Sequence, residues 1–298
     1  MTTDEPPILR PKHYGEPSKF RVESLLREGR RQRDLPDVPV PDVCLLDPDG
    51  DVVRHLQAAG LASRHPGWAC YHSELWVTHR GDRDIGIVPC AVGAPYAVLV
   101  AEELHASGCG LIVSVTSAGR VLPIGDPPYF VLIERAWRDE GTSLHYLPAS
   151  EWSHLRPELL SLLDGAFEGF AEPVSVGTSW TTDAPFRETK TAIAAATHAG
   201  VHAVEMEAAA LYAYATAKQR DIVCVAHVTN NMGIGGDDFE KGSDAGAHQT
   251  LAVVDAIVRA WMLRRPRLDH QTSAKRPPAA IEKFECCLLY TSPSPRDS

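Results

Sequence analysis

The sequence predicts an α/β protein in three layers, with helices on both faces of a twisted, mostly parallel central sheet. Short runs of β-type residues alternate with longer helical patterns, and most of these runs are apolar throughout, which is typical of strands buried on both faces. The chain has 298 residues, 44% of them hydrophobic and 23% charged, which suffices for a sizeable core.

The chain begins with a segment that we expect to be an arm and linker, residues 1–41. This segment is rich in proline and charge, and residues 18–33 are predicted to form a basic surface helix anchored by Leu25 and Leu26. Residues 34–42 are expected to be extended, because their prolines fix φ and remove N–H donors. We expect the arm to pack on a neighbouring subunit.

The folded domain is expected to span residues 42–265. Apolar runs predict its strands at 43–46, 74–79, 84–90, 111–116, 129–134, 173–177, 201–206 and 221–229. Longer runs rich in strong helix formers predict helices at 94–107, 157–169, 187–199, 207–218 and 245–263. Residues 266–298 share no pattern with this domain, and we expect either a disordered tail or appended vector-derived sequence there.

Composition narrows the classes of partner. The formal net charge of −10 argues against nucleic acid as the main partner, and an anionic substrate would need a local cationic pocket. No apolar run is long enough to span a bilayer. The seven cysteines form no CxxC pair, and no signal peptide is evident at the N-terminus, so we expect a cytoplasmic protein.

The most informative string is VEMEAAALYAYA at 204–215, where a strand-like run passes directly into a helix. Open α/β sheets bind ligands at such strand ends. A carboxylate at this place can accept hydrogen bonds from two neighbouring hydroxyls, as a ribose offers them. Alternatively, Glu207 alone merely favours the positive end of the helix dipole.

This string resembles the signature of the nucleoside phosphorylase and uridine phosphorylase family. The segments 93–104, 111–119, 179–189 and 223–231 are similar to further family motifs in the same order, so the resemblance covers about residues 42–262. It implies a phosphorylase-like α/β/α fold whose mixed sheet partly curls into a barrel. It also implies ribosyl transfer, orthophosphate as co-substrate, no metal or organic cofactor, and a homo-oligomer, either a dimer or a trimer of dimers.

For the sugar, the resemblance implies that Glu207 accepts the ribose 2′ and 3′ hydroxyls and that Met206 packs against the ring. Glu205 is expected either to assist in this contact or to be satisfied by nearby backbone.

For the base, the resemblance points to Asn230 and Asn231 at the end of an apolar strand. An amide donates a hydrogen bond but is no general acid at pH 7, which favours an oxo base; the alternative is a simple turn. Arg187 is expected to bind the base or to be an exposed helix-start arginine. Trp180 is expected to stack on the base or to pack in the core.

At the phosphate site the sequence departs from the family pattern. The loop at 46–50 lacks the expected arginine, and Ser114 stands where a second arginine is usual. Thr116, Ser117 and the backbone at Gly119 remain as donors to phosphate or another nucleophile. Arg120 and Arg64 are candidate substitutes.

We therefore expect a nucleoside phosphorylase that uses phosphate to form free base and ribose 1-phosphate. Two alternatives stay open: a nucleosidase that uses water, and a non-catalytic nucleoside-binding protein on the same scaffold. A dinucleotide oxidoreductase and a serine hydrolase are disfavoured, because GIGG at 233–236 and TSAG at 116–119 lack the required spacing. The scattered histidines show no metal-binding spacing, and His227 is expected to be a satisfied core histidine.

Overall fold

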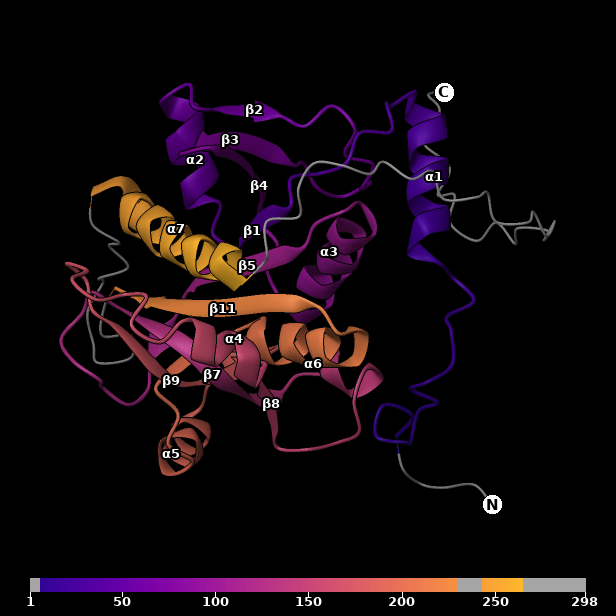
Figure 1. The fold of residues 1–298 in the computed structure, drawn as a ribbon. Coiled ribbons are helices and arrows are strands. Elements are labelled where there is room, and N and C mark those ends of the chain that lie inside the picture. Colours follow the sequence, from indigo (N-terminus) through magenta and orange to yellow (C-terminus); the bar gives the residue numbers. More distant parts are fainter. Residues whose placement is uncertain (1–5, 230–242, 265–298) are drawn as a thin grey trace, which may run out of the picture. The chain divides into compact units, whose positions relative to one another are not determined.

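The computed structural model describes residues 6–229 and 243–264, which belong to a compact unit, Met1–Arg264. An 11-stranded sheet in the order β2-β3-β4-β1-β5-β11-β7-β9-β10-β6 forms its centre, with β8 paired to β7 (Figure 1). The strands are β1 Val43–Asp47, β2 Ala62–Arg64, β3 Trp76–Arg80, β4 Arg83–Pro89, β5 Leu111–Ser117, β6 Gly119–Arg120, β7 Tyr129–Asp139, β8 Trp152–His154, β9 Val174–Thr182, β10 Ala203–Glu205 and β11 Asp221–Val228.

Helices cover both faces of this sheet. Strands β4 and β5 lie on either side of β1, so the connection from β1 to β4 and the connection from β4 to β5 run in opposite directions along the sheet. Because such crossovers are right-handed, their helices α2 and α3 lie on opposite faces. Helix α7 packs against α2, and α6 packs against α3. The helices are α1 Val22–Arg33, α2 Asp51–Ala58, α3 Ala94–Ala106, α4 Pro157–Leu162, α5 Lys190–His198, α6 Ala208–Lys218 and α7 Ala247–Arg264.

The sheet is mixed, because two parallel groups meet at an antiparallel pair. Strands β4, β1, β5 and β11 run parallel, β7 pairs with β11 in the opposite sense, and β9 and β10 run parallel to β7. The expected α/β/α class with a mixed central sheet is confirmed. The expectation of a mostly parallel central sheet also holds, because five of the six neighbouring pairs from β4 to β10 are parallel. Strands β2, β3, β6 and β8 add antiparallel pairs to it.

The sheet also curls back on itself. Strand β6 follows β5 after the single residue Ala118, and it pairs with β10, which lies four strands from β5 in the sheet. Val204 of β10 lies opposite Gly119, which is two residues beyond the end of β5. This pairing brings the Glu205–Glu207 string next to the end of β5, and it gives the partial barrel that the resemblance implies.

The other elements follow the expected pattern, with differences that have local causes. Helix α2, which the sequence analysis missed, has only eight residues and begins after Gly50, whose φ is 72°. Helix α5 begins at Lys190, later than expected, because the Thr189 side chain accepts a hydrogen bond from the amide of Ala192. Helix α4 ends at Leu162, and turns follow it.

The N-terminal helix α1 is confirmed and packs against α3. Leu26 is its buried anchor, whereas Leu25 is only half-buried. The Arg33 guanidinium donates hydrogen bonds to the carbonyl groups of Ala69 and Cys70, which ties the helix to the domain. Of the described helices, none has the length and apolar character needed to cross a membrane.

Candidate active site

The loops that carry the predicted site residues gather at one edge of the sheet. Strands β1, β5 and β11 are parallel neighbours, so their carboxyl ends lie together, with Ser117 of β5 paired in register to His227 of β11. The β6–β10 pair adds the end of β10 to this group. The edge therefore combines the β1–α2 loop, the end of β5 and the Glu205–Glu207 string.

Glu207 lies directly before α6 and is 2% exposed. Its Oε1 accepts a hydrogen bond of 2.7 Å from the amide of Gly93, whose φ of 87° favours glycine. Two of the family-like motifs thus meet in one contact. The Oε2 atom is buried and has no hydrogen-bond partner among the described residues. A buried acceptor without a partner is costly, so Oε2 is suited to receive a ligand hydroxyl.

Burial raises the pKa of Glu207 from 4.5 to about 8, and the nearby charge of Glu205 adds to the rise. In the unfolded chain this carboxyl ionises near 4.5, whereas in the folded, ligand-free chain its pKa is about 8. A ribose hydroxyl that donates to Oε2 would favour the ionised form, so binding of a nucleoside would lower this pKa. Unfolding of the ligand-free chain therefore releases a proton in this window, and the stability that is fully present below pH 4.5 is lost as pH rises to about 8.

A melting series tests this consequence. We expect the unfolding free energy of the wild type to fall between pH 5 and 8 by up to about 1.4 kcal/mol per pH unit relative to Glu207→Gln, which cannot ionise. Thermal unfolding of both proteins should be followed across this range. Parallel curves for the two proteins would show that Glu207 titrates normally.

Glu205, by contrast, is fully used inside the protein. Its Oε1 accepts hydrogen bonds from the hydroxyls of Ser179 (2.9 Å) and Thr181 (2.5 Å), and its Oε2 accepts two of 2.7 Å from the amides of Glu207 and Ala208. Four bonds fill the acceptor capacity of a carboxylate. Of the two expected roles, a ribose contact and satisfaction by nearby groups, the structure supports only the second. Glu205 thus fixes the start of α6 and the position of Glu207.

Met206 lies between the two glutamates and is half-buried, so part of its side chain is accessible, as a contact with a sugar requires.

Ser117 is engaged by a residue that the sequence analysis did not select. The Asp49 Oδ2 atom accepts hydrogen bonds from the Ser117 amide (2.9 Å) and hydroxyl (2.7 Å). The Ser117 hydroxyl, which was predicted to hold a nucleophile, therefore binds a carboxylate of the β1–α2 loop together with the Ser117 amide. The close spacing of Asp47, Asp49 and Asp51 after a buried strand was the available signal for this loop.

The rest of the β1–α2 loop is also acidic. Asp47 is buried and accepts a hydrogen bond of 3.0 Å from the amide of Val53, and burial raises its pKa to about 6. Arg54, one turn into α2, donates to the carbonyl of Asp49 and pairs with the carboxylate of Asp51. Arg54 is the cation nearest in sequence to this loop, and the Asp51 carboxylate of the same segment neutralises its charge.

The other predicted donors have mixed positions. Thr116 is buried and its hydroxyl donates to the carbonyl of Ser117, while Gly119 is paired with β10. The Ser114 hydroxyl, at the place of the expected arginine, is buried without a partner among the described residues. Arg120 lies on β6, opposite Ala203.

Arg64 is not a phosphate ligand within one chain. Arg64 lies on the edge strand β2 and forms an ion pair with Glu74. Strand β2 is four strands away from β5, which is about 19 Å at the usual strand spacing.

The predicted base residues are not brought together in the described part of the chain. Asn230 and Asn231 lie outside the described residues. Arg187 is exposed on the turn after β9. Trp180 is 2% exposed, its indole N–H donates to Asp139 (2.9 Å), and it packs in a small core cluster. The expectation that Trp180 stacks on a base is therefore wrong, because no face of its ring is free.

A tryptophan in the core affects stability and not substrate binding. We expect Trp180→Phe to lower the unfolding free energy by about 1–3 kcal/mol, through the lost bond to Asp139 and a smaller ring. Its kcat/KM on any substrate should stay within about twofold of the wild type. Denaturant unfolding and initial rates measure the two effects. A selective rise of KM would show that Trp180 contacts the base.

His227 is a satisfied core histidine, as expected. It is buried, its Nε2 lies 3.0 Å from Glu172 Oε2, and its ring stacks on Phe130.

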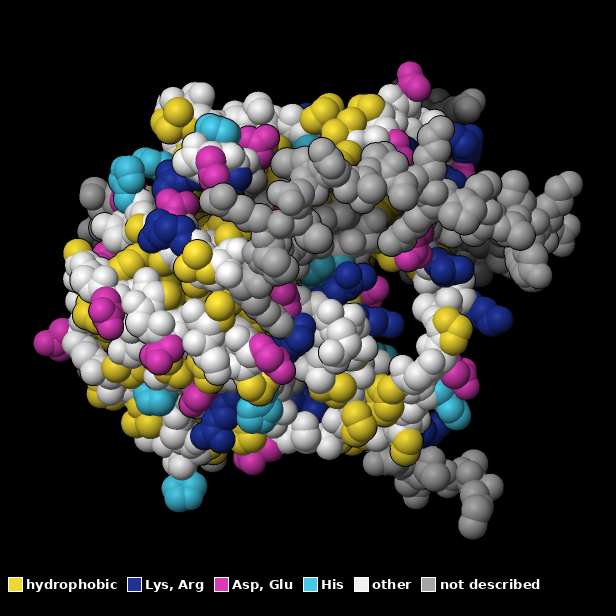
Figure 2. Space-filling model, viewed as in Figure 1, with side chains coloured by type: hydrophobic (Ala, Val, Ile, Leu, Met, Phe, Trp, Pro, Cys, Tyr) yellow, Lys and Arg dark blue, Asp and Glu magenta, His cyan; other side chains and the backbone are white. Residues whose placement is uncertain are grey.

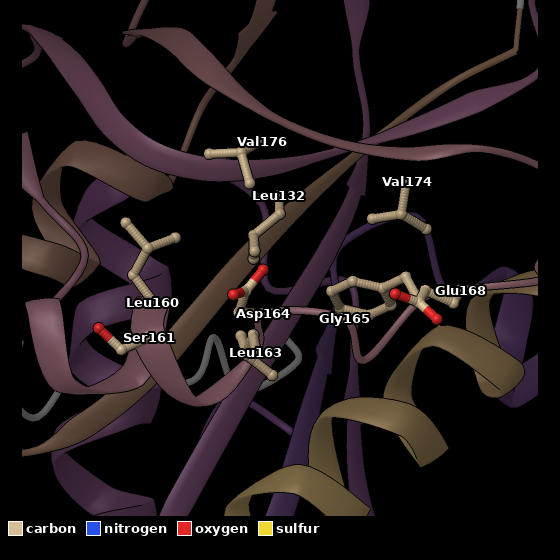
Figure 3. A pocket seen from close by; sticks show the side chains of 10 residues that line it. Leu132, Leu160, Ser161, Leu163, Asp164, Gly165, Glu168, Val174 and Val176 are labelled. Carbon is tan, nitrogen blue, oxygen red and sulfur yellow. The ribbon is translucent and has the colours of Figure 1, made fainter.

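A cavity of about 590 Å³ lies away from these residues, between the turn after α4 and strands β7 and β9. Figure 3 shows its lining, in which Leu132, Val174 and Val176 face the segment that carries Asp164. It contains none of the predicted site residues.

Comparison with known proteins identifies the architecture that carries this site. The family model described as the phosphorylase superfamily matches residues 36–259. The chain belongs to the phosphorylase superfamily. This match confirms the resemblance to the phosphorylase family.

Two relatives within the superfamily illustrate the match. A guanosine phosphorylase from Halorubrum lacusprofundi is 27% identical over 180 residues, which cover 59% of this chain and 72% of the relative. A crystal structure of uridine phosphorylase from Vibrio fischeri ES114, in complex with 6-hydroxy-1-naphthoic acid, has a TM-score of 0.62 at 16% identity. A second structure of that uridine phosphorylase has a TM-score of 0.60, also at 16% identity. Each superposition covers 78% of this chain and 94% of the other, which confirms the superfamily's fold.

Proposed function

We propose that this enzyme cleaves the N-glycosidic bond of a ribonucleoside with phosphate, giving free base and ribose 1-phosphate. The observation that carries the proposal is the buried Oε2 atom of Glu207, which has no partner among the described residues. This acceptor lies at the end of β10, next to the end of β5, where a sugar would lie close to Ser117 and to the Asp49 carboxylate that Ser117 binds. The relatives named guanosine phosphorylase and uridine phosphorylase support the same reaction.

In the proposed reaction the bond between ribose C1′ and the base nitrogen breaks, and its electron pair leaves with the base. A phosphate oxygen forms the new bond to C1′. Glu207 and Met206 hold the ribose, while Asn230, Asn231 and Arg187 are proposed to hydrogen-bond the base as it becomes anionic. Fixed donors and acceptors of this kind stabilise developing charge without reorganisation. The proposed reaction draws on protein groups and phosphate alone.

Hydrolysis is a second candidate, favoured by the contact between Asp49 and Ser117. A carboxylate on these two donors repels a phosphate dianion, and it is well placed to accept a proton from water. The water oxygen would then bond to C1′, its proton would pass to Asp49, and the base would leave with the electron pair. If phosphate is the nucleophile, we expect weak binding, with a KM above about 1 mM.

Asp49→Asn separates the two candidates. For phosphorolysis, removal of the negative charge should lower the KM for phosphate by about tenfold or more, since a like charge is lost. For hydrolysis, loss of the general base should lower the rate of free ribose formation by about 10²–10⁴-fold. Ribose 1-phosphate and ribose should be measured separately, with the exposed Asp82→Asn as control. A variant unchanged in both measurements would remove Asp49 from the site.

We further propose a homo-oligomer, a dimer or a trimer of dimers, in which the arm contacts a neighbour. In a single chain, the arm residues Phe20 and Leu9 are 73% and 50% exposed, which suits such a contact. Nucleic acid is not a proposed partner: on the face shown in Figure 2, described lysines and arginines lie among acidic side chains and form no continuous basic surface.

A further inference from the structure

Three potential metal ligands meet at one place although they are distant in the sequence. His55 lies in α2, Asp244 in the short helical turn Ser243–Gly246, and His248 in the first turn of α7. Each offers one ligand atom, and these atoms all lie within 4.8 Å of one another. Helix α2 packs against both the turn and α7, which brings His55 to the segment that carries Asp244 and His248.

The three side chains differ in freedom. The Asp244 side chain is 18% exposed, and its Oδ2 lies 3.9 Å from His248 Nε2. The His55 and His248 rings meet edge to face, with centroids 4.8 Å apart. The His248 side chain is 74% exposed and can turn about its own bonds. The group therefore has two partly buried ligands and one mobile ligand that opens to solvent.

The backbone fixes Asp244 in this position. Asp244 and Ala245 have φ values of 58° and 51°, a conformation that residues with a Cβ rarely adopt. Gly246 follows with a φ of 74°, and a Cβ there would lie 2.5 Å from the ring of His227. Packing on His227 thus holds the turn in an unfavourable conformation, as is common where a turn serves a binding site.

We propose that His55, Asp244 and His248 bind a divalent transition-metal ion of the Zn²⁺, Co²⁺ or Ni²⁺ class. Two imidazoles and one carboxylate suit these ions, whereas Ca²⁺ and Mg²⁺ prefer oxygen ligands throughout. Bonds of about 2.0–2.2 Å place tetrahedral ligand atoms about 3.4 Å apart, so the distances between ligand atoms, now within 4.8 Å, would shorten by up to about 1.4 Å on binding. The ion would keep at least one position for water.

The bound ion joins α2 to the start of α7. Helix α2 directly follows the loop that carries Asp49, so an ion bound to His55 of α2 would restrict the movement of that loop. Asp244 also accepts a hydrogen bond of 3.3 Å from the amide of His248, so part of its role is to cap α7. The substitution His248→Gln keeps the backbone N–H that donates to Asp244, so it separates capping from metal binding.

The test is metal titration of the untagged, metal-free full-length protein. Zn²⁺ should be titrated by calorimetry and Co²⁺ by visible absorption, which reports its coordination geometry. We expect one equivalent to bind and to raise the melting temperature. His55→Gln and His248→Gln should each weaken binding by more than about tenfold and abolish the rise in melting temperature, because each loses a direct ligand.

His79→Gln is the matched control. His79 is exposed and pairs with Asp84, and among the described residues no third metal-binding side chain joins this pair. This variant should bind metal like the wild type. Melting of the metal-free variants shows whether they fold, and the exposed His248 can be replaced without disturbing the core. An absence of binding, or unchanged affinity in both His55→Gln and His248→Gln, would overturn the proposal.

Discussion

Glu207→Ala is expected to lower kcat/KM for every nucleoside that the enzyme cleaves by roughly 30- to 5,000-fold, or about 2–5 kcal/mol of transition-state stabilisation. The reason is the environment of the carboxylate. It is 2% exposed, and one oxygen is held by the amide of Gly93 while the other has no partner among the described residues. In the proposed binding mode, removal of the side chain would leave two ribose hydroxyls in a dry site without an acceptor.

Glu207→Gln should lose less activity, because one carbonyl acceptor survives. The exposed Glu151→Gln serves as control and should retain wild-type kinetics. Initial rates at several nucleoside concentrations give kcat/KM for each protein. If Glu207→Ala stays within about twofold of the wild type, the ribose does not bind at Glu207.

The second large effect is on stability and concerns Glu205. Glu205→Ala removes the acceptor for the hydroxyls of Ser179 and Thr181 and for two amides at the start of α6. Thr181 also accepts a hydrogen bond from the amide of Ala209, so the loss affects a connected network. We expect the unfolding free energy to fall by about 2–5 kcal/mol.

Denaturant unfolding of Glu205→Ala and of the exposed control Glu151→Ala measures this difference. Glu205→Gln should be intermediate, because its amide group offers one acceptor but also brings donors towards two backbone amides. If Glu205→Ala is as stable as Glu151→Ala but binds nucleoside more weakly, then Glu205 contacts the ligand and does not hold the helix.

The longer strands and helices of the body were predictable because their apolar runs are regular, whereas the eight-residue helix α2 was missed. The closure of the sheet was not, because β6 has two residues and its pairing with β10 joins segments far apart in sequence. Three-residue strands such as β2 and β8 carry too little pattern to be recognised. Only the resemblance to a family indicated the partial barrel.

Within the candidate site, the Glu-Met-Glu string indicated where we propose that the ribose binds, but it did not distinguish the two glutamates. Their difference depends on Ser179 and Thr181, which β9 places beside Glu205. The contact between Asp49 and Ser117 likewise joins two loops that no sequence spacing relates. In both cases the decisive information is which neighbours satisfy a polar group, and this follows from tertiary packing.

The most direct test of the central claim is product analysis. The protein should be incubated with guanosine, inosine, uridine, adenosine and methylthioadenosine, with and without phosphate, and the base, ribose and ribose 1-phosphate identified. We predict release of free base from at least one nucleoside, with ribose 1-phosphate formed only when phosphate is present. Free ribose at an unchanged rate without phosphate would show hydrolysis. Binding of a nucleoside without any cleavage, with or without phosphate, would contradict the account. The protein would then be a non-catalytic nucleoside-binding protein with this fold.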